Sequence, residues 1–347
     1  MKTRTNITCP AIALFALACF ALSPTVRAVL PAPSGGYPGQ NTADGDDALF
    51  SLTTGVSNTA IGFEALFSNT YGLGNTAVGD SALAHNTSGI DNTALGEEAL
   101  DSNTDGFGNV AIGSFALLLS TANENTAIGF SALGLNTIGN QNTAIGFDVL
   151  SSNTTGYGNT ATGYDALVTN STGSNNTANG AFALRGNSTG IKNTANGNNA
   201  LLLNKTGNGN TAEGAGALGS NTGSFNAALG FNAGASRITG SNNIDIDNVG
   251  VAGESNTLRI GTVKQTATFI AGISGVAVTG SPVVVNSSGK LGISGTSSIR
   301  FKEAVKPMNK ASESILQLKP VTFRYKQEID PDGQSAVWLS CRGGRQD

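Results

Sequence analysis

The chain repeats one unit, Asn125-Thr-Ala-Ile-Gly-Phe-Ser-Ala-Leu-Gly-Leu-Asn-Thr-Ile-Gly-Asn-Gln141, and begins it again at Asn142-Thr-Ala-Ile-Gly146. Twelve such units follow one another, each 17 residues long except for two of 16. They open with Asn-Thr-Ala-x-Gly, or a close variant, at Asn41, Asn58, Asn75, Asn92, Asn109, Asn125, Asn142, Asn159, Asn176, Asn193, Asn210 and Asn226. Self-similarity at a fixed period is the signature of a fold in which each unit packs on its neighbours. The period therefore predicts a solenoid of stacked coils.

Fixed positions within the unit predict how one coil is built. Position five is glycine in every coil, which predicts a corner with positive φ or a close backbone contact, and a second glycine near position fifteen marks another corner. Short strands between the corners would stack each asparagine on that of the previous coil, as a hydrogen-bonded ladder. Position nine is leucine in eleven coils, beside a small residue, and predicts a core that includes Leu66, Leu83, Leu100, Leu117, Leu133, Leu150 and Leu167.

Position four carries a stripe of a different kind. It is polar at Thr162, Asn179, Asn196 and Glu213, whereas from the second to the seventh coil it is apolar, at Ile61, Val78, Leu95, Ile112, Ile128 and Ile145. Strand alternation places position four on the same side of the chain as position two and opposite the alanine between them. A stripe that becomes polar without interrupting the repeat is not the core of one solenoid, so we expect another chain to cover its apolar part.

These observations predict an all-β fold, a parallel β-solenoid over residues 41–240. Repeats of the Asn-Thr-Ala-Ile-Gly type resemble the head repeats of trimeric autotransporter adhesins, which are called YadA-like or haemagglutinin-like. This resemblance implies a left-handed β-roll that associates as a homotrimer, here through the position-four stripe. The coil of that family is shorter, which predicts an extra corner residue or a short helical turn around Ala-Leu. A leucine-rich repeat is the alternative fold, although 17 residues is short for it.

The N-terminus predicts export. Lys2 and Arg4 precede an apolar run from Ala11 to Leu22, and Val26-Arg-Ala28 supplies the small residues of a cleavage site. We expect a signal peptide at residues 1–28, a linker at 29–40 and no membrane span after removal of the signal. Cys341 would then be the only cysteine left, so no disulfide framework is expected. The net charge of −4 and the absence of a basic patch argue against nucleic-acid binding.

Residues 241–296 predict an irregular β stem. Ser241–Ile246, Ser255–Ile260, Thr268–Ile273 and Val283–Asn286 have strand patterns, and the last of these leads into a turn at residues 287–290. The composition changes at Ser297, where charged residues gather and Pro307 begins a candidate helix. Val321-Thr-Phe-Arg-Tyr-Lys326 alternates as a strand and completes a short α+β segment.

Residues 297–334 resemble the start of the intramolecular chaperone auto-processing domain of endosialidase tailspikes. The resemblance is carried by Ser297-Ser-Ile-Arg-Phe-Lys302 and by Leu318-Lys-Pro-Val-Thr-Phe-Arg-Tyr-Lys326. In that family the domain assists trimerisation of a β-rich fibre and then cuts itself off. The resemblance implies Ser297 as the nucleophile, Lys302 as its base, and the bond from Thr296 to Ser297 as the cleavage site. Because the family domain is about twice as long, we expect it to be truncated and inactive here.

Residues 335–347 are predicted to be an out-of-frame tail. The resemblance stops after Asp330-Pro-Asp-Gly333, and the following residues show no β pattern and hold the only Trp. An allowed back-translation of this tail, shifted by one base, encodes Pro-Gln-Phe-Gly-Leu-Val-Ala-Glu-Glu-Val, which resembles the continuation of the family.

The sequence favours an exported or cell-surface fibre with an adhesive role and an unknown receptor. Two other functions stay open: a self-processing peptidase-chaperone fibre of tailspike type, and an ice- or glycan-binding array along the threonines of position two. No cofactor and no metal site are expected. His85 is the only histidine and is expected to be a solvated corner residue, while Asp44, Asp46 and Asp47 are expected to cap the solenoid.

Overall fold

The computed structural model describes residues 37–236, 239–267, 283–287 and 289–293, and the backbone of two further strands at 319–324 and 335–340. The chain divides into two units, residues 1–268 and 269–347. The described part is all-β and contains no helix. The fold is a parallel β-solenoid of about thirteen turns built from 17-residue coils, as the repeat predicts.

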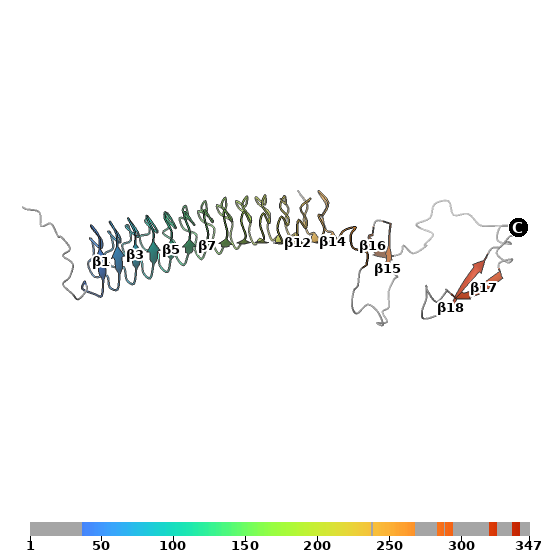
Figure 1. The fold of residues 1–347 in the computed structure, drawn as a ribbon, viewed down its shortest axis with the longest axis horizontal. Helices are drawn as coiled ribbons and strands as arrows, with labels where there is room; N and C mark the ends of the chain where they lie inside the picture. The colour runs from blue at the N-terminus through green and yellow to red at the C-terminus, as the bar shows by residue number, and fades with distance from the viewer. Residues whose placement is uncertain are drawn as a thin grey trace, which may run out of the picture. The chain divides into compact units, whose positions relative to one another are not determined.

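One parallel sheet of fourteen strands runs through the first unit in chain order (Figure 1). Each strand has three residues and pairs in register with the same positions of the next coil, so that Thr126 lies beside Thr143 and Ile128 beside Ile145. The strands are β1 (Thr42–Asp44), β2 (Thr59–Ile61), β3 (Thr76–Val78), β4 (Thr93–Leu95), β5 (Val110–Ile112), β6 (Thr126–Ile128), β7 (Thr143–Ile145), β8 (Thr160–Thr162), β9 (Thr177–Asn179), β10 (Thr194–Asn196), β11 (Thr211–Glu213), β12 (Ala227–Leu229), β13 (Ile244–Ile246) and β14 (Leu258–Ile260).

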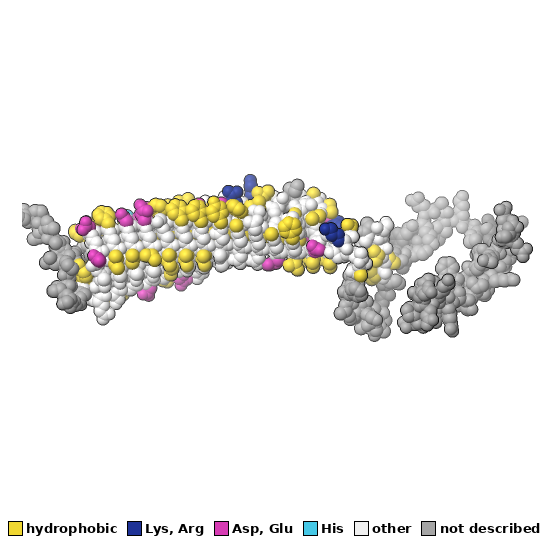
Figure 2. Space-filling view, viewed as in Figure 1, with side chains coloured by type: hydrophobic (Ala, Val, Ile, Leu, Met, Phe, Trp, Pro, Cys, Tyr) yellow, Lys and Arg dark blue, Asp and Glu magenta, His cyan; other side chains and the backbone are white. Residues whose placement is uncertain are grey.

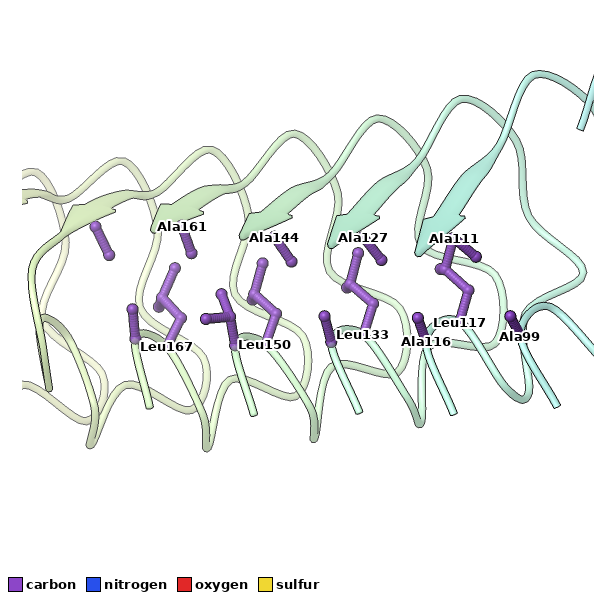
Figure 3. Packing of buried hydrophobic residues seen from close by; sticks show 14 of the residues in the cluster. Ala99, Ala111, Ala116, Leu117, Ala127, Leu133, Ala144, Leu150, Ala161 and Leu167 are labelled. Carbon is purple, nitrogen blue, oxygen red and sulfur yellow. The ribbon is translucent and has the colours of Figure 1, made fainter. Parts of the chain in front are cut away.

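The interior is a file of leucines that faces the alanines of the strands (Figure 3). All seven leucines of the predicted core have no exposed surface, and Ala127 and Ala144 of the strands are equally buried. The small alanines let the sheet approach the leucine file closely, so each coil is narrow and densely packed. The predicted core is confirmed.

The leucines lie in turns and not in strands. Their φ values fall between 50° and 55°, and position seven of most coils also has a positive φ, as at Asp148. A left-handed backbone at two nearby positions cannot belong to a helix. The expected helical turn around Ala-Leu is therefore absent, and the corner alternative is the one that forms. The leucine-rich repeat is wrong because the strand is Thr-Ala-x and the leucine follows it.

Glycine at position five combines the two features expected of it. Gly113 has a φ of 129°, and a Cβ there would lie 2.5 Å from the carbonyl oxygen of Gly129 in the next coil. An L side chain would be strained by the backbone and would also push two coils apart. Gly89 at position fifteen lacks a positive φ, but its Cβ would meet the carbonyl oxygen of Gly106 at 2.5 Å.

Two buried asparagine ladders connect the coils. In the first, the backbone N–H and the side-chain Nδ2 of Asn142 both donate to Oδ1 of Asn125, at 2.9 and 3.2 Å. In the second, Nδ2 of Asn153 donates to Oδ1 of Asn136 at 2.7 Å. Asn142 and Asn153 also donate to the carbonyl oxygen of Gly156, each at 2.9 Å, so the ladders meet at the second glycine corner. The expected ladder is confirmed at position one, and position twelve adds another.

The last two strands, β13 and β14, continue the parallel sheet past the twelfth coil. Charged residues replace the inward alanine there: Asp245 is fully buried in β13, and Arg259 takes the paired place in β14. Arg259 forms two hydrogen bonds to Glu254, at 2.9 and 3.0 Å, and these raise the pKa of Arg259 above its ordinary value. This charged group ends the apolar interior.

The described residues of the second unit form two antiparallel strand pairs. β15 (Val283–Val285) and β16 (Leu291–Ile293) form a hairpin across the predicted turn, where the Asn286 N–H donates to the Lys290 carbonyl oxygen at 3.1 Å. β17 (Lys319–Arg324) pairs with β18 (Ser335–Ser340), which confirms a strand near Val321. The tail was expected to lack a β pattern, and β18 corrects this, since Ala336, Val337 and Trp338 pair with β17. The predicted strand at Thr268–Ile273 and the candidate helix at Pro307 lie outside the described residues.

Candidate association surface

The position-four stripe lies on the outer side of strands β2 to β7. In each strand the middle alanine is buried, while the residues on either side point outward. The exposed fractions are 41% for Ile61, 45% for Leu95 and 39% for Ile145, and the other three members are half-buried. Figure 2 shows the stripe as a narrow line of apolar side chains along the stack. The structure thus brings all six predicted residues together on one surface.

Beyond β7 the same line becomes a polar ladder. Nδ2 of Asn179 donates to Oδ1 of Asn196 at 2.9 Å, and Nδ2 of Asn196 donates to Oε1 of Glu213 at 2.8 Å. The Asn179 to Asn196 bond is exposed to solvent. The outer line is therefore apolar from β2 to β7 and polar from β8 to β11, and it becomes apolar again at Leu229 of β12.

A second apolar line runs along the corner that follows position five. Five aromatic rings contact one another from coil to coil there, with centroids 5.3 to 5.6 Å apart; the three central rings are stacked and each end ring meets its neighbour edge-on. We call them the aromatic ladder: Phe115, Phe130, Phe147, Tyr164 and Phe182. Figure 2 shows this ladder within the broader apolar band of the same face. The ladder was not predicted, although aromatic residues at position six of three successive coils were a signal for it.

Ionisable residues border the aromatic ladder. Burial raises the pKa of Asp148, the negative charge of Asp165 raises it further, and a hydrogen bond with Ser131 partly opposes both effects. Arg185 lies over the ring of Phe182, 5.5 Å from its centroid, and its Nε is 3.5 Å from Oδ2 of Asp165. Arg185 keeps 53% of its side chain exposed and can reach a further partner.

The residues proposed for catalysis, Ser297 and Lys302, and the proposed cleavage site at Thr296, lie outside the described residues. His85 is exposed, with Nδ1 at 3.2 Å from Oδ1 of Asp101. Within the described part of the chain, no group of three or more His, Cys, Asp or Glu side chains is placed to hold a metal ion. The same residues include no helix suited to crossing a membrane.

The chain matches one known family, over a short stretch. Residues 297–338 match the family described as chaperone of endosialidase. No curated protein and no solved structure matches the chain significantly. A parallel β-solenoid that precedes a match to this chaperone fits a protein of the phage tail-fibre type.

Proposed function

We propose that this chain is an exported structural fibre protein that assembles as a homotrimer, with an adhesive head of the YadA-like type. The position-four stripe carries the proposal. It is an apolar line along the sheet whose members face outward, three of them exposed and three half-buried. Water contact with such a line is unfavourable, and burial against identical stripes removes it.

Another exposed apolar file runs along the first four coils, at position sixteen. Val56, Leu73, Ile90 and Phe107 occur two residues before each next coil begins, with exposed fractions between 39 and 42%. In a three-fold arrangement each copy contacts two neighbours, so two separate apolar files suit a trimer better than one. The match to the chaperone of endosialidase agrees, because the resemblance implies a domain that assists trimerisation.

Light scattering on residues 29–296 tests the trimer. We expect about three times the monomer mass at micromolar concentration. Replacing Ile112 and Ile128 with asparagine should dissociate the trimer, because it places polar amides in the contact, while leaving the coils folded. Asn196→Thr serves as the control in the polar stretch from β8 to β11, and this variant should remain a trimer. A wild-type monomer would contradict the proposal.

The aromatic ladder adds no sugar-stacking site to the glycan-binding alternative, which rests on the threonines of position two. Phe130, Phe147 and Tyr164 stack with interplanar angles of 13° and 7°, so their faces contact one another and only their edges reach solvent. Stacking on a sugar needs an open ring face. The threonines of position two share the outer face with the stripe, and a thermal hysteresis measurement tests the ice-binding alternative directly.

A further inference from the structure

The charge of the solenoid is divided along its length, contrary to the even spread that its small net charge suggests. Residues 41–184 contain no lysine or arginine, and their acidic residues are Asp44, Asp46, Asp47, Glu64, Asp80, Asp91, Glu97, Glu98, Asp101, Asp105, Glu124, Asp148 and Asp165. The first cation in the solenoid is Arg185, at the far end of the aromatic ladder. Figure 2 shows acidic side chains toward the N-terminal end of the apolar band and basic side chains beyond its other end.

One corner of the solenoid therefore changes character in a fixed order. Positions six and seven carry Asp46, Asp47, Glu64, Asp80, Glu97 and Glu98 in the first four coils, and the aromatic ladder occupies the next five. Arg185, at position ten of the ninth coil, lies over Phe182 and ends this sequence of side chains. Two copies that run in opposite directions therefore have complementary charges along this corner. If the second copy is turned end for end, its Arg185 lies beside the glutamates of the first.

We propose that the aromatic ladder is a contact between two copies of this chain that lie antiparallel. The two-fold axis passes between Phe130 and Phe147, so the sixth coil of one copy faces the seventh of the other. Counting outward, the fourth coil with Glu97 then faces the ninth with Arg185. The contact is isologous and closes on itself, since each copy offers the same patch.

Charge repulsion favours the antiparallel orientation over the parallel one. A parallel pair in register would place Glu97 beside Glu97, and residues 41–184 offer no cation to relieve the repulsion. The exposed Arg185 already contacts Asp165 and Phe182 and has donors to spare. Within one copy Glu97 lies five coils from Arg185, about 24 Å at the usual strand spacing. Any direct pairing of these two residues must therefore be intermolecular.

The contact does not depend on the trimer and forms between monomers or between trimers alike. Its residues follow position five, whereas the proposed trimer uses the outer face at position four. The exposed rings form a small patch, which is typical of a weak and reversible association. The exposed fractions are 45% for Phe130, 44% for Phe147 and 48% for Tyr164.

Sedimentation velocity of the purified full chain over a range of concentrations tests the contact. At high dilution the sedimenting species should be a monomer or a trimer. As the concentration rises, we expect its average mass to increase through lateral association. Phe147→Ser combined with Tyr164→Ser should weaken this association about tenfold or more. Phe231→Ser is the matched control, because Phe231 is also at position six, is 76% exposed and lies outside the ladder. It should associate like the wild type.

A charge swap tests the orientation. Arg185→Glu alone and Glu97→Arg alone should each weaken association, because each places like charges in contact. The two changes in one chain should restore it, which a parallel contact in register does not allow. Failure of the swap to restore association would overturn the proposal, and so would a wild-type mass independent of concentration or ladder variants that associate like Phe231→Ser.

Discussion

At position nine, each coil places a leucine in a left-handed backbone. Such a φ is unfavourable for a branched side chain, and the structure maintains it because the side chain is fully buried against the alanines. Sequence could identify these leucines as core from their spacing. It could not identify their backbone conformation, since nothing in the residue type distinguishes a left-handed leucine from a helical one.

Leu133→Ala should lower the free energy of unfolding by roughly 2–5 kcal/mol, because it leaves a cavity inside the stack. Asn179→Ala should lower it by less than about 1 kcal/mol, because its hydrogen bond to Asn196 is exposed. Denaturant unfolding of both variants checks the difference. Equal losses would mean that the inner and outer faces of the coil have been assigned the wrong way round.

Asp148→Asn should raise the thermal unfolding midpoint at neutral pH. The pKa of Asp148 is raised by burial and by Asp165, so its ionised form is less favourable in the folded than in the unfolded chain. This cost is fully present above the folded-state pKa and disappears below the unfolded one. The gain should therefore shrink as the pH falls from about 7 to about 3.

Asp91→Asn is the control for this comparison, because Asp91 is exposed and has a similar φ of 55°. Asparagine tolerates a left-handed backbone, so neither variant should add strain. A pH-independent gain at Asp148 would show that its charge is not the cause.

At the scale of the coil, the fifth unit is a defect in an otherwise regular ladder. Ser120 replaces the asparagine of position twelve there, in a coil of 16 residues. Nδ2 of Asn136 donates to the Ser120 hydroxyl at 3.2 Å, whereas Oδ1 of Asn103, on the other side, has no hydrogen-bond partner in the described part of the chain. A buried acceptor left unpaired costs stability.

Ser120→Asn should restore the ladder and raise the free energy of unfolding by about 1 kcal/mol. Ser120→Ala should lower it, since Asn136 then loses an acceptor. Chemical denaturation compares the two. A loss of stability in Ser120→Asn would show that the shorter corner has no room for an amide.

The strands themselves could be predicted well, because Thr-Ala-x recurs at a constant spacing and its middle residue is always small. The second asparagine ladder could have been predicted from the same spacing at position twelve. The choice between a helical turn and a corner could not, because it depends on φ signs at positions seven and nine. β18 was not predicted because Ser335–Ser340 shows only weak alternation of apolar and polar residues. Its pairing with β17 is made by the backbone, which the side-chain pattern does not reveal.

Across the whole molecule, the division of charge should make the proposed trimer sensitive to salt. Three parallel copies align residues 41–184, which have carboxylates and no lysine or arginine. Repulsion extends about 30 Å at 0.01 M salt and about 8 Å at physiological ionic strength. The trimer should therefore weaken at low salt, which light scattering in a sodium chloride series would measure. A trimer equally stable throughout would show that these carboxylates stay far apart.

The chain should remain intact between Thr296 and Ser297. The resemblance assigns Ser297 and Lys302 to self-cleavage, but the matched segment is short, and a lysine acts as a base only when its surroundings desolvate it. Intact mass spectrometry of the expressed protein checks this. A fragment that ends at Thr296, and that is lost in Ser297→Ala, would contradict it.

The outer surface was harder to predict from the sequence than the core, and burial explains the difference. Burial forces one residue type at a position in every coil, and repetition then reveals it. Exposed positions vary freely, so the aromatic ladder alternates between positions six and seven and is recognisable only once the corner has a known shape. The apolar stripe was found because its six members happen to be consecutive.

The strands of the solenoid run across its length, and every coil bonds to the next through contacts such as the Thr126 N–H to the Asn142 carbonyl oxygen at 2.8 Å. Tension along the axis therefore opens one inter-coil seam at a time. Each detached coil releases 17 residues, about 56–61 Å of extended chain, where it occupied about 4.8 Å of the stack. Under tension, each coil that detaches therefore lengthens more than about tenfold. Such a tether would absorb mechanical work coil by coil.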